Sequence, residues 1–464
     1  MNISNSTKLI EIIKSILLVV LLLFTILLLY FFWGRDVFQN FIKEDLPRHE
    51  AMNAAELLQP GRIEIGFGGG DFTVTDGKFQ TIMDCFKGFS DSRNLSVEEI
   101  TKERYKEVMQ AGFIKAVFDY YAPFSAVCEA NGIDRIPGSD AIDAVGELGY
   151  ASDFDDRLFV FDSKGDKYYR IIGSSTNGFE ALKNEISEME KDYIAYYPLA
   201  MIAGGAENNT LCPLSFECDI HDLACYPEDF SSKPEGTGDL IKGFFSDNFD
   251  FVRRIEQESG TLIYMYGYGR IVVTAHDSGA LEYRREDDER TRTIPQLRYL
   301  DALERASSFI AAHGAFEVKS GDIFTPYIKE VIIDPDGKKG YRFTFGIRIN
   351  GARIYYESGA PMVVDVTGGR VSYFRRNLIN VGENDQDERK SREVYPAINV
   401  LADNIEHMGE TSFEELVEKV TGFDCGYVKT NRNRNTLAAA WVISIDGRKF
   451  YFGLDDGKPI GGRR

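Results

Sequence analysis

The stretch YRFTFGIRING, residues 341–351, decides the fold. From Tyr341 to Ile349 its apolar side chains alternate with polar or small ones, which is the two-residue period of a β-strand. Asn350-Gly351 follows, a dipeptide favoured in two-residue hairpin turns because both turn positions need positive φ. We therefore predict a long strand that reverses direction at Asn350.

An earlier stretch of the chain is similar to the segment that begins at this turn. GTLIYMYGYGRIVVTAHDSGALEYRR (260–285) aligns with GARIYYESGAPMVVDVTGGRVSYFRR (351–376) when the offset changes by one residue. The alignment predicts two copies of one strand meander, about ninety residues apart. The matched residues are Gly260, Ile263, Tyr264, Val272, Val273, Gly279, Tyr283 and Arg285 with Gly351, Ile354, Tyr355, Val363, Val364, Gly369, Tyr373 and Arg375.

Three helical patterns lie between and after the two copies. Pro295 opens the first, and Gly314 follows its last turn. Apolar residues in helical register within 398–408 form the second. Thr411 caps the third, which we expect to stop at Gly422.

The N-terminal part of the body shows the same kinds of element. RIEIGFGGGDFTVTDG (62–77) predicts two strands around a glycine turn, and 157–172 predicts another hairpin. The glycines suggest a dinucleotide-binding turn, but a strand-like alternation follows them where such a site needs a helix. Ser96 and Glu99 form a capping box that predicts a helix ending at Gly112.

These elements predict an α+β fold class, with antiparallel sheets flanked by helices. The chain finishes with two strands around Asp446-Gly447 that would bury Trp441. A polar stretch over 203–238 breaks the pattern and is the best long loop or boundary. The predicted organisation is a tail (1–15), an anchor (16–33), an N-terminal α+β domain (34–202), a loop with the central meander (203–294) and a C-terminal α+β domain (295–464).

The anchor is the stretch ILLVVLLLFTILLLYFFW, residues 16–33, whose one polar side chain is Thr25. As a helix it would be about 27 Å long, close to the hydrocarbon thickness of a bilayer. It ends in bulky aromatic residues rather than at a small-residue cleavage site, so we expect a transmembrane helix and not a signal peptide. We predict a cytoplasmic N-terminus and an exported body. Partner-facing residues would be Ser15, Thr25, Tyr30, Trp33 and Gly34.

Composition narrows the possible ligands. A formal net charge of −20 and a pI of about 4.9 argue against nucleic acid, anionic lipid surfaces and anionic wall polymers as main ligands. Cys212, Cys218, His221 and Cys225 offer a zinc-ligand set, but their spacing leaves a zinc site, one disulfide and free thiols all open.

The sequence contains no motif that predicts catalysis. His pairs on one helix face, a GxSxG elbow and a P-loop are all missing. DPDGKKG (334–340) begins like a calcium loop, but Phe345 stands where a bidentate Glu is needed. We predict no catalytic, cofactor-binding or metal-binding residue, and no enzymatic activity.

Several blocks of the sequence resemble the YycH family. They are LQPGRIEIGFGGGDFTVTDGKF (58–79), the two blocks FFSDNFDFVRR to LEYRR (244–285) and RINGARIYY to VSYFRR (348–376), and the ending AAAWVISIDGRKFYFG (438–453). YycH proteins, with their shorter relative YycI, are membrane-anchored accessory regulators of the WalK sensor histidine kinase in low-GC Gram-positive bacteria. The cysteine-bearing loop and the Gly-rich turn depart from the family.

The resemblance implies a non-catalytic regulator that contacts a WalK-like kinase through its transmembrane helix and its extracytoplasmic body, together with a YycI-like co-regulator. Such a regulator acts only if it prefers one kinase conformation, and the family allows both restraint and stimulation. Two other functions stay open from the residues alone. One is an anchored envelope hydrolase or hydrolase inhibitor, and the other is an extracytoplasmic solute-sensing module.

Overall fold

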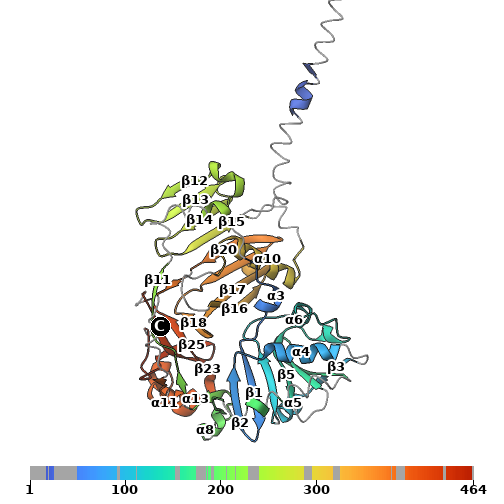
Figure 1. Cartoon of the computed structure of the whole chain (residues 1–464), viewed down its shortest axis with the longest axis vertical. Helices are drawn as coiled ribbons and strands as arrows, with labels where there is room; N and C mark the ends of the chain where they lie inside the picture. Colours follow the sequence, from blue (N-terminus) through green and yellow to red (C-terminus); the bar gives the residue numbers. More distant parts are fainter. Residues whose placement is uncertain are drawn as a thin grey trace, which may run out of the picture. The chain divides into compact units, whose positions relative to one another are not determined.

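The computed structural model falls into two units, residues 1–48 and residues 49–464 (Figure 1). The residues that the structure describes are 17–18, 20–25, 50–90, 95–110, 112–151, 157–173, 184, 187–189, 193–204, 206–214, 216–227, 240–286, 295–316, 324–377, 379–382, 392–431 and 435–461.

The first unit contributes a short part of the predicted anchor. Residues 17–18 and 20–25 are helical, and their large apolar side chains are exposed. The rest of 16–33 lies outside the described residues. Within the described part of the chain, no helix has both the length and the apolar composition needed to cross a bilayer. The anchor therefore stays a prediction.

The N-terminal part of the second unit is built on a nine-stranded antiparallel sheet, ordered β3-β7-β6-β5-β4-β1-β2-β8-β9. Its strands are β1 (Arg62–Gly68), β2 (Asp71–Thr75), β3 (Ser96–Ile100), β4 (Phe113–Val117), β5 (Val145–Ala151), β6 (Arg157–Asp162), β7 (Lys167–Ile172), β8 (Tyr196–Pro198) and β9 (Leu211–Pro213). Its helical elements are α4 (Phe79–Ser90), α5 (Lys102–Val108), α6 (Phe124–Ala130), η2 (Ser139–Ala141) and α8 (Leu199–Ile202).

Two predicted hairpins of this sheet are confirmed, and the predicted start of one helix is wrong. β1 pairs with β2 across a turn of three glycines with positive φ, and β6 pairs with β7. The residues from Ser96 form strand β3 instead of a helix, because they pair with β7 at the sheet edge. On β3, Glu98 accepts a hydrogen bond from Arg170 Nε at 2.8 Å. The helix begins later, at Lys102, and Thr101 caps it by accepting from Arg104 N.

The C-terminal part is built on a fourteen-stranded sheet, whose main path runs β12-β13-β14-β15-β20-β19-β17-β18-β23-β24-β11-β21. Its strands are β11 (Leu223–Pro227), β12 (Arg253–Glu256), β13 (Leu262–Tyr266), β14 (Ile271–Ala275), β15 (Leu281–Arg285), β16 (Phe324–Ile333), β17 (Gly340–Ile349), β18 (Ala352–Tyr356), β19 (Met362–Thr367), β20 (Arg370–Arg376), β21 (Ile379–Val381), β23 (Val420–Lys429), β24 (Thr436–Ile445) and β25 (Arg448–Gly453). β10 (Glu217–Cys218) and β22 (Arg392–Glu393) form a separate pair.

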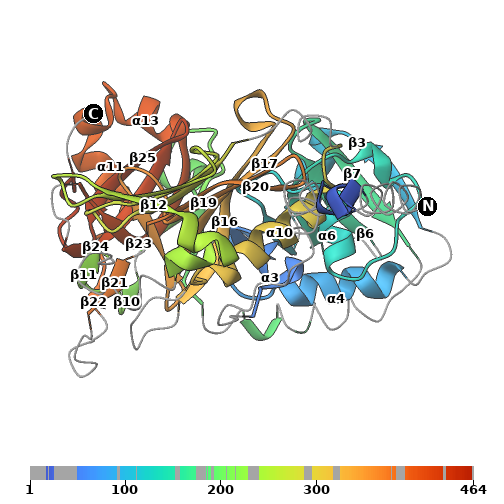
Figure 2. The ribbon, with the colours of Figure 1, turned by 90° about the horizontal axis from the view of Figure 1, so that it is seen from above.

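Helices flank this sheet, as predicted for an α+β fold. They are α3 (Ala54–Leu57), α10 (Tyr299–Ala312), α11 (Ala397–Asp403), α12 (Ile405–Met408) and α13 (Phe413–Lys419), with 3₁₀ turns η3 (Ser246–Phe251) and η5 (Pro335–Gly337). α10 packs across β17, β19 and β20 (Figure 2). The η5 turn lies within DPDGKKG.

The predicted repeat is partly right. β17 turns at Asn350-Gly351 as expected, with both φ angles positive, and β13, β14 and β15 form a meander. The second copy is not a meander, because β17 lies between β18 and β19. Its offset also stays at 91 residues, since the pair Val273–Tyr283 corresponds to the pair Val364–Phe374. A bulge in β20, where Ser372 is skipped between the pairs Asp365–Tyr373 and Val366–Val371, absorbs the residue that the alignment removed.

Helix boundaries in the C-terminal part differ from the prediction. α10 begins at Tyr299, after Pro295, and the second predicted helix is split into α11 and α12 at Asn404. The buried amide of Asn404 donates to the carbonyls of two other residues, Val400 and Gly457, which fixes the break. The cap of α13 is Ser412 rather than Thr411, and Gly422 lies in β23.

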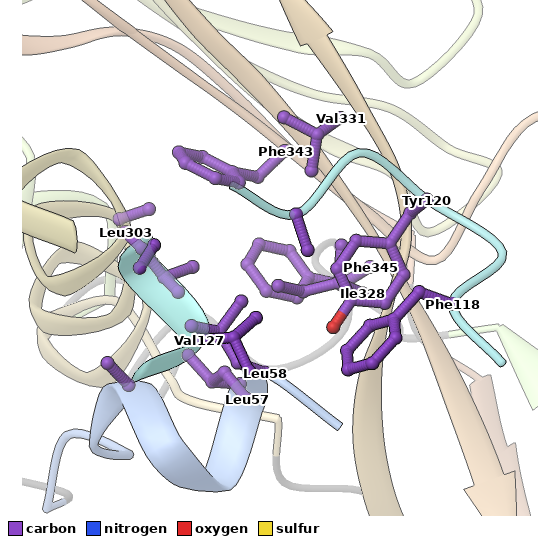
Figure 3. Packing of buried hydrophobic residues seen from close by; sticks show 14 of the residues in the cluster. Leu57, Leu58, Phe118, Tyr120, Val127, Leu303, Ile328, Val331, Phe343 and Phe345 are labelled. Carbon is purple, nitrogen blue, oxygen red and sulfur yellow. The ribbon is translucent and has the colours of Figure 1, made fainter. Parts of the chain in front are cut away.

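One hydrophobic core joins the two sheets (Figure 3). Side chains from the N-terminal part meet side chains from α10, β16 and β17, so both sheets bury apolar area against a common interior. The labelled members are Leu57, Leu58, Phe118, Tyr120, Val127, Leu303, Ile328, Val331, Phe343 and Phe345. A second core lies under α11 and α13, where buried Trp441 donates to the carbonyl of Tyr395 at 2.8 Å, as the prediction of a buried tryptophan requires.

The stretch predicted as a long loop, 203–238, contains β9, β10 and β11. β9 completes the N-terminal sheet, whereas β11 pairs with β21 and β24 of the C-terminal sheet. This stretch therefore links the two sheets by strand pairing.

Candidate functional site

Two arginines lie side by side where the hairpin β17–β18 meets the N-terminal sheet. Arg348 and Arg353 are direct cross-strand partners across the Asn350-Gly351 turn. Like charges at opposite positions repel, so this pair needs anionic or aromatic neighbours. Both guanidinium groups lie 5.1 Å from the ring centroid of Tyr327, a favourable cation–π distance.

Strand β16 supplies this aromatic platform. Tyr327 pairs with Gly346 of β17, and a side chain at position 346 would overlap the tyrosine ring. The glycine therefore lets the ring lie against the sheet, next to both arginines. Because β16 pairs with β17 along nearly its whole length, the platform has a fixed position.

Oxygen atoms from three other segments contact the two arginines. Arg353 Nη1 lies 3.3 Å from Asp119 Oδ2 and 3.7 Å from Asp424 Oδ2. Both arginines also donate to the carbonyl of Gly61, at 3.3 Å from Arg348 Nη2. A side chain at position 61 would overlap the carboxylate of Asp119. We call Tyr327, Arg348, Arg353, Asp119, Asp424 and the Gly61 carbonyl the arginine cluster.

A chain of ion pairs continues from the arginine cluster into the N-terminal sheet. It crosses β1, β4 and β5 and ends where the hydroxyl of Tyr105 on α5 donates to Glu147. The distances are 3.3 Å for Arg62 Nη1–Asp119 Oδ1, 2.7 Å for Arg62 Nε–Glu64 Oε1, 3.0 Å for Lys115 Nζ–Glu64 Oε2 and 3.1 Å for Lys115 Nζ–Glu147 Oε1. Charges of opposite sign therefore alternate along the whole path.

The charges along this series of ion pairs shift the pKa values of the residues in it. Burial alone would raise the pKa of Glu64, but Lys115 and Arg62 outweigh it and lower that pKa to about 2. Burial would lower the pKa of Lys115, but Glu64 and Glu147 raise it. Both groups stay charged at neutral pH, so the ion pairs persist there.

The arginine cluster is suited to holding segments together rather than to chemistry. A guanidinium stays protonated near neutral pH and cannot act as an acid or base there, and the acidic groups around it are engaged in ion pairs. Asp119 and Asp424 are 39% and 37% exposed, whereas Arg348 and Arg353 are 11% and 12% exposed. The cluster therefore fixes how the start of β1 docks on the β17–β18 hairpin.

Of the residues predicted to contact a partner, only Thr25 is described. Its hydroxyl donates to the carbonyl of Leu21 at 2.7 Å, one helical turn earlier. Ser15, Tyr30, Trp33 and Gly34 lie outside the described residues. Their role stays a prediction.

The predicted cysteine cluster is spread over several strands. Cys212 on β9 is buried in the core under α11 and α13, whereas Cys225 on β11 is buried in the core that joins the two sheets. Cys218 lies on β10, and all six cysteines are free thiols. The described residues contain no group of three or more His, Cys, Asp or Glu side chains able to hold a metal ion.

A sequence motif could not have revealed the arginine cluster. Gly61, Asp119 and Arg353 lie far apart in the chain, and only the paired strands bring them together. One local signal was present: Arg348 and Arg353 stand at equal distances on either side of Asn350-Gly351, so a hairpin there makes them cross-strand partners. Such a like-charge pair predicts acidic partners from elsewhere in the fold.

Known proteins resemble this chain in fold. No model of a known protein family matches it, and no curated protein does. Among solved structures, the crystal structure of YycH from Bacillus subtilis matches with a TM-score of 0.60 and 9% sequence identity, covering 87% of this chain and 98% of that chain. An uncharacterized protein from Eubacterium rectale matches with a TM-score of 0.34 and 12% identity, covering 54% of this chain and 90% of that chain. The chain has a YycH-like fold.

Proposed function

We propose that this chain is a non-enzymatic, membrane-anchored regulator of a WalK-like sensor histidine kinase. The observation that carries the proposal is the YycH-like fold over 87% of the chain, which agrees with the sequence blocks that resemble the YycH family. In this proposal the N-terminus is cytoplasmic, residues 16–33 cross the membrane once, and the body is extracytoplasmic. A YycI-like protein is the expected co-regulator.

Two features of the chain support this role. The apolar side chains at positions 17, 18 and 20–24 are exposed, so they need an apolar environment such as lipid or a partner helix. In the body, the common core and the arginine cluster join the two sheets, and this gives a partner one surface with fixed geometry.

Regulation requires that the chain bind one kinase conformation better than the other. A preference of about 1 to 3 kcal/mol would change the kinase equilibrium about 5 to 150-fold. Either sign of the change agrees with the proposal.

Co-purification tests the proposed partner. The full chain and its cognate sensor kinase are expressed together, solubilised in mild detergent and separated by size, with an unrelated sensor kinase of similar size as control. The proposal expects co-elution with the cognate kinase alone. Separate elution, or equal co-elution with both kinases, argues against it.

Protease access tests the proposed topology. Protease added to intact cells should degrade the body and leave a cytoplasmic reporter fused to the N-terminus intact. If the body survives in intact cells and is cut only after lysis, the body is on the cytoplasmic side and the proposed role fails.

A further inference from the structure

Two aromatic side chains project from one end of the C-terminal sheet. Phe251, the last residue of η3, is 71% exposed, and Tyr268, in the β13–β14 turn, is fully exposed. Outside residues 17–25, these are the two most exposed large hydrophobic side chains of the described part of the chain. With Arg253 and Arg270 they form what we call the aromatic tip.

Strand pairing brings these residues to the same end of the sheet. Arg253 pairs with Met265, so Phe251, two residues before Arg253, lies next to the turn that follows Tyr266. The hydroxyl of Tyr266 donates to Asn248 Oδ1 of η3 at 3.2 Å. The contact fixes η3 against the end of β13.

The backbone around Tyr268 is in an unfavourable conformation. Tyr268 has a φ of 58° and stands between Gly267 and Gly269, whose φ angles of 60° and 89° are also positive. Glycine adopts this region without cost, whereas a residue with a Cβ does not. A tyrosine in the middle of such a turn indicates that its exposed ring has a function.

The aromatic tip carries positive charge on an acidic protein. Arg253 and Arg270 are exposed, and neither has an ion-pair partner among the described residues. Nearby, Arg254 pairs with Glu256 at 3.3 Å, and two further acids, Asp250 and Glu286, are exposed. The backbone N–H of Glu286 donates to the carbonyl of Arg270 at 2.9 Å. On a chain of net charge −20, this end is therefore locally close to neutral and can approach phosphate groups.

Met52, near the start of the body, contacts α10, and the segment just beyond α10 contacts the segment that precedes η3. The carbonyl of Met52 accepts a hydrogen bond from Ser307 Oγ of α10 at 2.7 Å. Just beyond the end of α10, the His313 ring stacks on Phe244 at 4.1 Å, and Phe244 shortly precedes η3. Residues 34–49 span at most about 55 Å when fully extended.

We propose that the aromatic tip inserts into the headgroup layer of the membrane that holds the anchor. Tyrosine, phenylalanine and arginine together suit this layer, because the rings enter the acyl boundary while the charged groups remain among the headgroups. A stable protein interface buries about 800 Å² on each partner, more than two rings of about 150 to 250 Å² supply. In this proposal residues 34–49 connect the anchor to the body and keep the aromatic tip near the lipid, so a weak contact suffices.

This inference rests on the proposed membrane anchor, and tryptophan quenching tests both separately. The full chain is reconstituted into vesicles of ordinary or brominated phosphatidylcholine. Trp33→Phe removes the anchor tryptophan, and Trp441 stays as a constant buried background. Tyr268→Trp is then compared with Tyr226→Trp, because Tyr226 is exposed on β11, near the opposite end of the strand order.

We expect brominated lipid to lower the emission of tryptophan at position 268 and to leave position 226 unchanged. Adding Phe251→Asp should reduce the loss at position 268. Equal emission in both lipids at position 268, or equal loss at both positions, overturns the inference. So does a change at position 268 that appears only when the kinase is added, which would assign the aromatic tip to a protein partner.

The unsubstituted chain distinguishes a failure of the proposed anchor from a failure of the inference about the aromatic tip. Quenching of Trp33 by brominated lipid reports the anchor itself. If Trp33 is quenched and position 268 is not, the inference about the aromatic tip fails while the anchor stands. If Trp33 is not quenched, the proposed anchor fails.

Discussion

The contact between β15 and β20 and the arginine cluster between the two sheets are stabilised in opposite ways. At β15 and β20, rings from β15, α10 and the segment before η3 pack with Phe374, which is fully buried. We call Phe244, Tyr283, Phe309, His313 and Phe374 the aromatic cluster. Its centroid distances run from 4.0 Å for Phe309–His313 to 6.5 Å for His313–Phe374. Between the sheets, the arginine cluster uses charged groups that stay partly exposed.

The difference shows which of the two contacts is insensitive to the salt concentration and which responds to it. Removing atoms from a buried ring lowers the free energy of unfolding of the protein, whereas salt hardly changes the contacts between buried rings. Partly exposed ion pairs respond to salt, and they depend on the geometry of single groups. The aromatic cluster contains one histidine, His313, and its response to acid makes the comparison testable.

The largest effect is expected for Phe374→Ala. This change should lower the free energy of unfolding by about 3 to 5 kcal/mol, because the ring leaves a cavity among four other rings. Chemical denaturation measures the change. Tyr268→Ala is the matched control, and as an exposed site it should stay within about 0.5 kcal/mol of the unsubstituted chain. A loss below about 1 kcal/mol for Phe374→Ala would contradict the proposed weight of the aromatic cluster.

Acid should destabilise the protein through His313. Burial lowers the pKa of His313 to about 4 in the folded chain, whereas the unfolded chain has the ordinary value of 6.5. Between these values the unfolded state binds more protons, so stability falls as pH decreases from 6.5 to 4, by about 3 kcal/mol in total. Denaturation across this pH window measures the loss.

His313→Phe is the matched variant for the acid test. It keeps a ring beside Phe244 and should remove the dependence between pH 6.5 and 4. Glu64 acts in a lower window, since its pKa of about 2 means that its stabilising effect is lost as pH falls from 4.5 towards 2. An unchanged pH profile in His313→Phe would assign the acid effect to other groups.

Removing one arginine should weaken the contact between the sheets. Arg353→Ala leaves Asp119 and Asp424 without their shared cation, and we expect a loss of about 2 kcal/mol in the free energy of unfolding. Arg353→Lys should recover only part of it, because an ammonium cannot reproduce the planar guanidinium contacts. Denaturation at low and high salt measures both. Full recovery by lysine would mean that only charge matters there.

The smallest effect is expected for Gly61→Ala. The added methyl would overlap the carboxylate of Asp119, which can move away, so we expect a cost of about 1 kcal/mol. With Asp119→Ala already present the overlap is gone, and Gly61→Ala should then cost less. A double-mutant cycle measures this coupling. Strict additivity would contradict the close approach of these two residues.

Local patterns predicted the hairpins better than the contacts between them. The alternation of 341–349, the Asn350-Gly351 turn and the final strands follow from neighbouring residues, and the structure confirms them. The prediction of a helix that begins at Ser96 is wrong, because pairing with β7 outweighs the capping signal. The arginine cluster could not be predicted from local patterns, because it depends on contacts of Gly61 and Asp119 with Arg353, which lies far away in the sequence.

The central claim is that this chain changes the output of a sensor kinase, and kinase autophosphorylation tests it most directly. The cognate kinase is reconstituted in proteoliposomes with a saturating amount of the full chain or without it, and the initial rate of phosphate incorporation is measured. We predict that the chain raises or lowers this rate by at least about 5-fold. Equal rates, with the chain shown to be inserted in the same vesicles, would contradict the claim.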